Sequence, residues 1–112
     1  MVQKNKGKGK GKSKVIDASL LIEGEVGLTT IFGIVEFPPA SRYCKVIYPT
    51  SQDFKKAIDI AWKLRKIGKP VGAVDILNAS ICVNRNFLLA TKDSDYENIK
   101  LVEPKFNFKL VK

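Results

Sequence analysis

The chain has 112 residues, which is enough for one domain with a buried core and too short for two. Hydrophobic residues make up 45% and charged residues 28%, which argues against disorder of the whole chain, and the net charge of +9 favours an anionic partner. No stretch approaches the roughly 18 apolar residues that span a membrane, and no apolar signal segment follows the basic start. We therefore expect a cytoplasmic protein without membrane contact.

Residues 1–14 form a segment of their own, with six lysines, three glycines and no acidic residue. Such a segment buries no apolar area and its charges repel one another, so we expect a flexible tail. It could add salt-dependent affinity for nucleic-acid phosphates, and it could equally be a solubilising segment or a remnant of cloning. Residues 15–112 are then predicted to form a single compact domain.

The first predicted element is a short buried strand that ends at Asp17, because two β-branched residues precede this acid. After a glycine-punctuated stretch, Thr29 or Thr30 could cap a short helix that ends before Pro38 and Pro39. The β-branched residues of this segment would suit a strand equally well. The helix is the interpretation that we favour.

Residues 44–48 are predicted to form a strand, and a clear amphipathic helix follows it. Thr50 and Asp53 form a variant of the capping box, apolar residues recur at spacings of three and four, and Gly68 offers a stop. The pattern assigns the aromatic residues of this helix to the core. The residues expected to face the core are Phe54, Ala57, Ile58, Ala61, Trp62 and Leu64.

A second, more deeply buried helix is predicted from Pro70 to about Asn84, since apolar residues cover most of its circumference. The apolar run 87–91 is typical of a strand covered on both faces, and the polar loop 92–95 follows it. A helical turn at 96–99 and a last strand near residues 100–102 complete the domain. Strands thus alternate with helices, which predicts an α/β sandwich with a mainly parallel central sheet flanked by helices.

Acidic residues lie where such a sheet places its ligand crevice. Asp17 ends the first strand and Asp93 follows the strand 87–91, so both are expected at the carboxyl edge of the sheet. Asp75 and Glu36 sit among apolar neighbours, where an ionised acid is costly unless a cation, a donor or water compensates it. A helix N-terminus contributes only about 0.3–1 kcal/mol to that compensation.

One isolated acid would more often cap a helix or pair with a lysine, whereas several converging acids favour a divalent cation. The chain has no histidine, so an all-oxygen site for Mg²⁺ or Mn²⁺ is expected and a zinc site is not. Such a centre can activate water against a phosphodiester. Candidate RNA-binding residues, each also interpretable as a solvated surface lysine, are Lys92, Lys63, Lys66 and Lys69.

Four segments, taken in order, resemble the PIN-domain family, and in particular the VapC-type toxins of prokaryotic VapBC toxin-antitoxin pairs. The segments are Val15–Ile22, Thr30–Glu36, Ala73–Ala79 and Leu89–Tyr96. The resemblance covers residues 15–103 and implies a PIN-like three-layer sandwich. It also implies an endoribonuclease that hydrolyses RNA phosphodiester bonds with Mg²⁺ or Mn²⁺.

Carried over to this sequence, the family's acids are Asp17, Glu36, Asp75 and Asp93. The resemblance implies that Asp17, Asp75 and Asp93 hold the metal and that Glu36 binds it directly or through water. Ser19, Thr91 and Asp95 would support the pocket. A cognate antitoxin and a homodimer are implied as partners.

The sequence departs from the family between Ile22 and Cys44, which leaves little room for the pair of helices that usually clamps the substrate. Target specificity and activity depend on that clamp. Two alternative functions therefore stay open. One is a non-catalytic basic module that binds nucleic acid or regulates while retaining the fold, and the other is a phosphoacceptor domain of flavodoxin-like topology that uses Asp17.

Overall fold

The computed structural model describes residues 13–112, and residues 1–12 of the predicted tail lie outside the described part. Lys14, the last residue of that predicted tail, already belongs to the first strand. In chain order the elements are β1 (Lys14–Ile16), α1 (Ala18–Leu21), β2 (Leu28–Thr30), α2 (Ile31–Glu36), the 3-10 helix η1 (Pro38–Arg42), β3 (Lys45–Ile47), α3 (Ser51–Lys66), α4 (Ala73–Arg85), β4 (Leu88–Thr91), α5 (Tyr96–Val102) and β5 (Asn107–Leu110). In the described part, no helix is long and apolar enough to cross a membrane.

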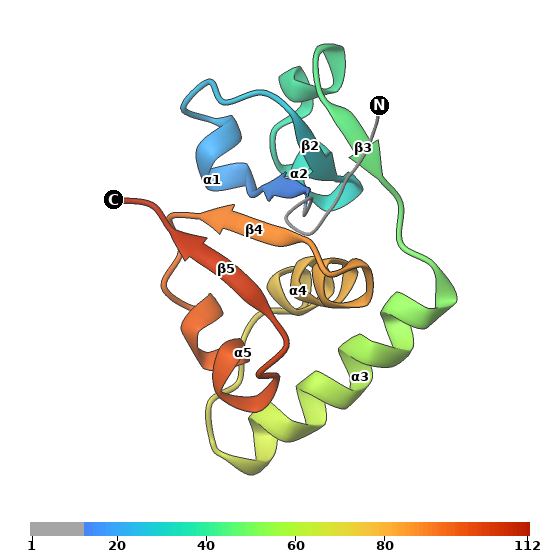
Figure 1. The fold of residues 1–112 in the computed structure, drawn as a ribbon, viewed down its shortest axis with the longest axis vertical. Helices are drawn as coiled ribbons and strands as arrows, with labels where there is room; N and C mark the ends of the chain where they lie inside the picture. The colour runs from blue at the N-terminus through green and yellow to red at the C-terminus, as the bar shows by residue number, and fades with distance from the viewer. Residues whose placement is uncertain (1–12) are drawn as a thin grey trace, which may run out of the picture.

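The strands form one five-stranded sheet in the order β3-β2-β1-β4-β5, and every neighbouring pair is parallel (Figure 1). This confirms the predicted parallel sheet. The central strand β1 lies between β2 and β4, and the backbone N–H of Asp17 continues the pairing by donating to Ala90 O at 2.9 Å. Asp17 therefore lies at the middle of the carboxyl edge.

Helices cover both faces of the sheet and produce the predicted three layers (Figure 1). Val15 and Leu89 pack in a core cluster with residues of α3, α4 and α5. Their neighbours Ile16 and Ala90 pack in a second cluster with α1 and η1. Successive strand residues thus point to opposite faces, and β4 is covered on both faces as predicted.

The start of α3 is tied to the end of α4 by one buried carboxylate. Asp53 is 0% exposed, and its Oδ2 accepts from the backbone N–H of Thr50 at 2.8 Å, as the predicted capping box requires. Arg85 donates to both oxygens of Asp53, at 2.9 and 3.0 Å, and Asn84 Nδ2 donates at 2.8 Å. These bonds fix the two longest helices of the described chain against each other.

The strand predicted near residues 100–102 is wrong, because these residues are the last turn of α5. Pro104 cannot continue a helix, so the chain leaves α5 there and forms β5 over Asn107–Leu110. Residues 28–36, before Pro38 and Pro39, were expected to form either a helix or a strand, and they contain one of each. Leu28–Thr30 form β2, and Thr30 then caps α2 by accepting from Gly33 N at 3.2 Å.

The core assignment of the two aromatic residues of α3 is also wrong. Phe54 is 47% exposed and Trp62 is 62% exposed, and Ile58 between them is 60% exposed. The buried positions of α3 are Asp53, Ala57, Ile60 and Leu64. Apolar residues therefore surround more of this helix than α4 and the sheet can cover, and periodicity alone does not distinguish the covered part.

Candidate metal centre

Asp17 is the best-supported carboxylate at the carboxyl edge of the sheet. It caps α1, and its Oδ2 accepts hydrogen bonds from Ser19 Oγ and Thr91 Oγ1, both at 2.9 Å, with Ser19 N at 3.5 Å. Ser19 and Thr91 were two of the three residues expected to support the pocket. Their hydroxyl groups, one from α1 and one from β4, hold this carboxylate in a single orientation.

The loop after β4 folds back onto the same two hydroxyl groups. Lys92 N donates to Ser19 Oγ and Asp93 N donates to Thr91 Oγ1, each at 3.0 Å. Asp95 N donates to Asp93 Oδ1 at 2.9 Å. Each hydroxyl therefore donates to Asp17 and accepts from the loop, and this arrangement fixes where the loop carboxylates lie.

Tyr96 connects Asp17 to Asp75, which lies in the first turn of α4. The hydroxyl group of Tyr96 lies 3.3 Å from Asp17 Oδ1 and 3.1 Å from Asp75 Oδ1, and its side chain is 0% exposed. One carboxylate oxygen from each of Asp75, Asp93 and Asp95 lies within 4.8 Å of the other two. Such a group of hard oxygen donors suits Mg²⁺ or Mn²⁺.

The electrostatics of Asp75 reflect this crowding. Burial raises its pKa to about 6, against the hydrogen bond from Tyr96, which lowers it. The negative charges of Asp93, Asp17 and Asp95 raise the pKa of Asp75 further. Burial and the charges of Asp17 and Asp75 also raise the pKa of Tyr96, so its hydroxyl group remains a proton donor.

Glu36, the last residue of α2, belongs to the same electrostatic field. Partial burial raises its pKa, and the negative charge of Asp17 raises it further. Its side chain is exposed, unlike that of Asp17. Asp75, Asp93 and Asp95 form a three-carboxylate cluster, in which Asp95 was expected only to support the other acids. Asp17 is connected to this cluster through Tyr96, and Glu36 is connected to it only by the effect of the Asp17 charge.

The lysines singled out for RNA binding are not gathered around these carboxylates. Lys92 follows β4 directly, and its ammonium group forms an ion pair with Glu23. Lys63 and Lys66 belong to α3, which Figure 1 shows on the side of the molecule away from α1, and Lys69 follows the end of that helix. Lys63 pairs with Asp59 on the same helix at 3.0 Å.

Sequence reasoning missed Tyr96 and Asn78. Asn78 is 2% exposed in α4, and its Nδ2 donates to the Tyr96 hydroxyl oxygen at 3.3 Å. The available signal was a polar residue three positions after Asp75 in an otherwise apolar helix. Buried amides are nearly always hydrogen-bonded, so this Asn required a partner.

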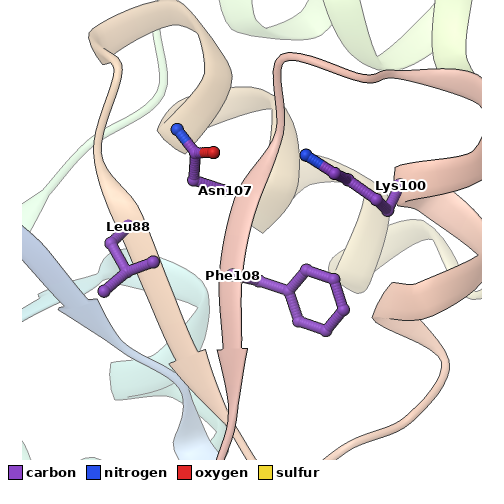
Figure 2. A pocket seen from close by; sticks show the side chains of 4 residues that line it. All are labelled: Leu88, Lys100, Asn107 and Phe108. Atoms are coloured by element: carbon purple, nitrogen blue, oxygen red, sulfur yellow. The ribbon is translucent and has the colours of Figure 1, made fainter.

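One hollow of the described surface lies away from these carboxylates, and no acidic residue lines it. It measures about 380 Å³ and is lined by Leu88, Lys100, Asn107 and Phe108 (Figure 2). Leu88 and Asn107 begin β4 and β5, so this hollow lies at the amino ends of the strands, opposite the carboxylates. Lys100 donates to the carbonyl oxygens of Pro104 and Phe106, both at 2.7 Å. These bonds hold the turn between α5 and β5, so Lys100 has a structural role.

The fold matches those of solved VapBC complexes. A chain of VapBC-1 from nontypeable Haemophilus influenzae superposes with a TM-score of 0.70 and 15% identity, over 87% of this chain and 96% of that one. A chain of the DNA-bound VapBC from Salmonella typhimurium gives 0.72 and 16%, over 88% and 97%. VapBC2 from Rickettsia felis, bound to a DNA fragment from its promoter, gives 0.66 and 13%, over 87% and 97%. No family model and no curated protein matches the sequence.

These superpositions cover nearly the whole described domain and confirm the predicted fold, a PIN-like α/β sandwich of the kind found in VapBC complexes. The likeness lies in the fold. What the chain does must be argued from its own carboxylates and their surroundings.

Proposed function

We propose that this protein is a metal-dependent endoribonuclease that hydrolyses RNA phosphodiester bonds, and that it is the toxin of a VapBC-type toxin-antitoxin pair. The observation that carries the proposal is the convergence of carboxylates at one edge of the sheet. Among residues 13–112, none of these carboxylates forms a salt bridge. They are Asp17, Asp75, Asp93 and Asp95, and Glu36 feels the charge of Asp17.

The donor set fits a hard divalent cation. Asp75, Asp93 and Asp95 would hold Mg²⁺ or Mn²⁺, because their oxygens already lie within 4.8 Å of one another and their charges oppose ionisation of Asp75. Asp17 would complete the centre, and Glu36 would bind directly or through water. When bound, the cation would supply an activated water and stabilise the charge that develops on the phosphodiester.

The chain's own residues would prepare the centre for that cation. Ser19 and Thr91 hold Asp17, and the backbone of the loop after β4 carries Asp93 and Asp95 to it. An anionic substrate needs positive charge near such an acidic crevice. Lys92, which directly precedes Asp93, would contact the RNA phosphates nearest the carboxylates. Lys63, Lys66, Lys69 and the lysines of residues 1–14 would contact phosphates farther along the RNA.

The proposal includes two protein partners and a cytoplasmic location. A cognate antitoxin would cover the carboxylates and block RNA, and the VapBC name of the superposed structures supports such a partner. A second copy of this chain would complete a homodimer. The support for the dimer is the exposed apolar residues of α3, which no part of the described chain covers.

Cleavage of single-stranded RNA in the presence of Mg²⁺ or Mn²⁺ tests the enzymatic part. We expect cleavage that EDTA abolishes and that Asp17→Asn or Asp75→Asn reduces at least about 100-fold, with RNA binding largely retained. Asp59→Asn is the matched control, because Asp59 is a surface acid of α3 paired with Lys63. Cleavage that persists in EDTA, or that Asp59→Asn reduces equally, would contradict the proposal.

A non-catalytic module that retains the fold is the second candidate function. The observation in its favour is the small size of the helices beside the carboxylates, four residues in α1 and six in α2. Such helices offer little surface to clamp a substrate. RNA binding that is indifferent to EDTA, with no cleavage of any RNA tested, is the result that this alternative predicts.

A further inference from the structure

Three buried polar side chains form a continuous chain of hydrogen bonds that ends at the carboxylates. Thr30 Oγ1 accepts from Gly33 N at 3.2 Å and donates to Asn78 Oδ1 at 2.6 Å. Asn78 Nδ2 donates to the Tyr96 hydroxyl oxygen at 3.3 Å, and that hydroxyl group faces Asp75 and Asp17. Thr30 and Asn78 are each 2% exposed and Tyr96 is 0% exposed, so bulk water does not replace these hydrogen-bond partners.

The carboxylates determine which group donates and which accepts in each hydrogen bond of this series. Ionised carboxylates only accept, so the single proton of Tyr96 must point to Asp75 or Asp17. The Tyr96 oxygen can then only accept a hydrogen bond from Asn78. Asn78 must therefore direct its Nδ2 to Tyr96 and its Oδ1 to Thr30. The reverse orientation of Asn78 would leave the Tyr96 oxygen with its lone pairs against two carboxylate oxygens, 3.1 and 3.3 Å away.

The Tyr96 hydroxyl group links two carboxylates that otherwise come from separate parts of the fold. Asp17 follows β1 and is already held by Ser19 and Thr91, whereas Asp75 comes from α4. The hydroxyl group engages Oδ1 of Asp75, and no hydrogen bond from residues 13–112 reaches Oδ2 of Asp75. The two carboxylates share the one hydroxyl proton, so Tyr96 sets where Asp75 lies relative to Asp17.

We infer that Tyr96 is a positioning residue of the metal centre, aimed by Asn78 and Thr30, and that it orients Asp75 toward Asp93 and Asp95. The inference rests on the proposed function, because it requires a cation at this centre. Partners that orient metal ligands typically contribute 10- to 100-fold to metal affinity. Tyr96→Phe removes this contribution while leaving the ring, whose centroid lies 6.0 Å from that of Phe106, in its packing position.

The test is the affinity of the metal-free protein for Mn²⁺, measured by the electron paramagnetic resonance signal of the unbound ion. We expect Tyr96→Phe to weaken Mn²⁺ binding about 10- to 100-fold. Asn78→Leu, which leaves the tyrosine intact, should weaken it less. In the Tyr96→Phe background Asn78→Leu should cause no further loss, because Asn78 acts only through the hydroxyl group that is missing there.

RNA cleavage gives a second readout that a purely structural role would not produce. Raising the Mn²⁺ concentration should restore cleavage by Tyr96→Phe, whose ligands are intact, and should not restore cleavage by Asp75→Asn. A defect of Tyr96→Phe that no Mn²⁺ concentration relieves would overturn the positioning role.

Ser80→Ala is the matched control for loss of a buried polar group. Ser80 lies on α4, is 0% exposed and donates to Ile76 O at 2.8 Å, with no connection to the carboxylates. It should lower the midpoint of urea unfolding and leave Mn²⁺ affinity unchanged. If wild type and Tyr96→Phe bind Mn²⁺ within twofold of each other, or if Ser80→Ala weakens binding as much, the inference fails and the proposed function stands. A wild-type protein that binds no Mn²⁺ would overturn both.

Discussion

At the scale of single residues, Asp75 carries the largest electrostatic cost of the carboxylate cluster. Burial, followed by neighbouring negative charges, raises its pKa from 3.8 to about 6, so the folded metal-free protein holds this proton more tightly than the unfolded chain does. The metal-free protein therefore gains stability at this residue as the pH falls through about 6 toward 4. A pKa raised from 3.8 to about 6 corresponds to ~3 kcal/mol, and solvent screening of this partly exposed group reduces that figure.

We predict that Asp75→Asn stabilises the metal-free protein at pH values near neutrality by about 1–2 kcal/mol, because a neutral side chain escapes this repulsion. The gain should shrink as the pH falls from about 6 to 4, because the wild-type carboxyl group becomes protonated in the folded protein while it is still largely ionised in the unfolded chain. Urea unfolding in EDTA over this pH range measures it. A variant that is less stable than wild type near neutrality would contradict the repulsion.

The order of stability should reverse when the cation is added. A ligand at about 100 times its Kd stabilises the folded state by about 2.7 kcal/mol, provided that it binds only that state. We therefore expect Mn²⁺ to raise the unfolding temperature of wild type and to leave that of Asp75→Asn nearly unchanged. Thermal unfolding with Mn²⁺ and then with excess EDTA measures this, and equal shifts in both proteins would place the cation elsewhere.

The sequence predicted the acids of the cluster better than the residues that hold them. Asp17 and Asp93 could be located because each follows a buried strand of a parallel sheet. Tyr96 could not, because its contact with Asp17 joins residues 79 positions apart and leaves no periodic trace in the sequence. Asn78 left a trace, a polar residue within an apolar helix, but its partner depends on the packing of α5.

At the scale of elements, the contact between α3 and α4 depends on Asp53. Burial alone would raise the pKa of this carboxyl group, but hydrogen bonds from Arg85, Thr50 and Asn84 lower it overall. Because the folded pKa lies below the unfolded value of 3.8, this stabilisation is present above about pH 4 and is lost as the pH falls through the folded pKa.

We predict that Asp53→Asn lowers the free energy of unfolding by about 2–3 kcal/mol near neutral pH, because it leaves Arg85 without its buried counter-charge. Asp59→Asn should change it by less than about 0.5 kcal/mol, since Asp59 and Lys63 form an exposed pair. Urea unfolding of both variants measures the difference. Equal losses in the two variants would show that the Asp53 contacts add nothing beyond a surface charge.

Element prediction succeeded where a strong periodic pattern coincided with a cap, as in α3, and failed for the short last strand. Lys100–Val102 were taken for a strand because three residues cannot separate a helical from an extended pattern. Alternation was present further on, where half-buried Phe108 and Leu110 flank the exposed Lys109 of β5. The burial that distinguishes these segments comes from β4 and α5, which the chain brings together only on folding.

At the scale of the whole molecule, α3 lies on the side away from α1, the helix that Asp17 caps (Figure 1). Phe54, Ile58 and Trp62 follow one another at intervals of four residues and are 47%, 60% and 62% exposed. They lie beside an apolar groove of about 240 Å³ between α3 and α4. Contiguous apolar surfaces of this kind mark protein interfaces. We call Phe54, Ile58 and Trp62 the apolar ridge of α3. In a dimer with a two-fold axis, the ridge of each copy would lie against the groove of the other.

We predict that sedimentation at micromolar concentration shows a dimer of the wild-type protein and a monomer of Ile58→Asp. The variant should dissociate because the dimer would bury a charge at the centre of the ridge without a partner. Leu101→Asp is the matched control, since Leu101 is 64% exposed on α5, outside the ridge, and should leave the dimer intact. The Ile58→Asp monomer should keep the Mn²⁺ affinity of wild type, because the ridge is separate from the carboxylates. A wild-type protein that sediments as a monomer, or a dimer that Leu101→Asp dissociates and Ile58→Asp does not, would remove α3 as the pairing surface and leave its apolar ridge to a different protein partner.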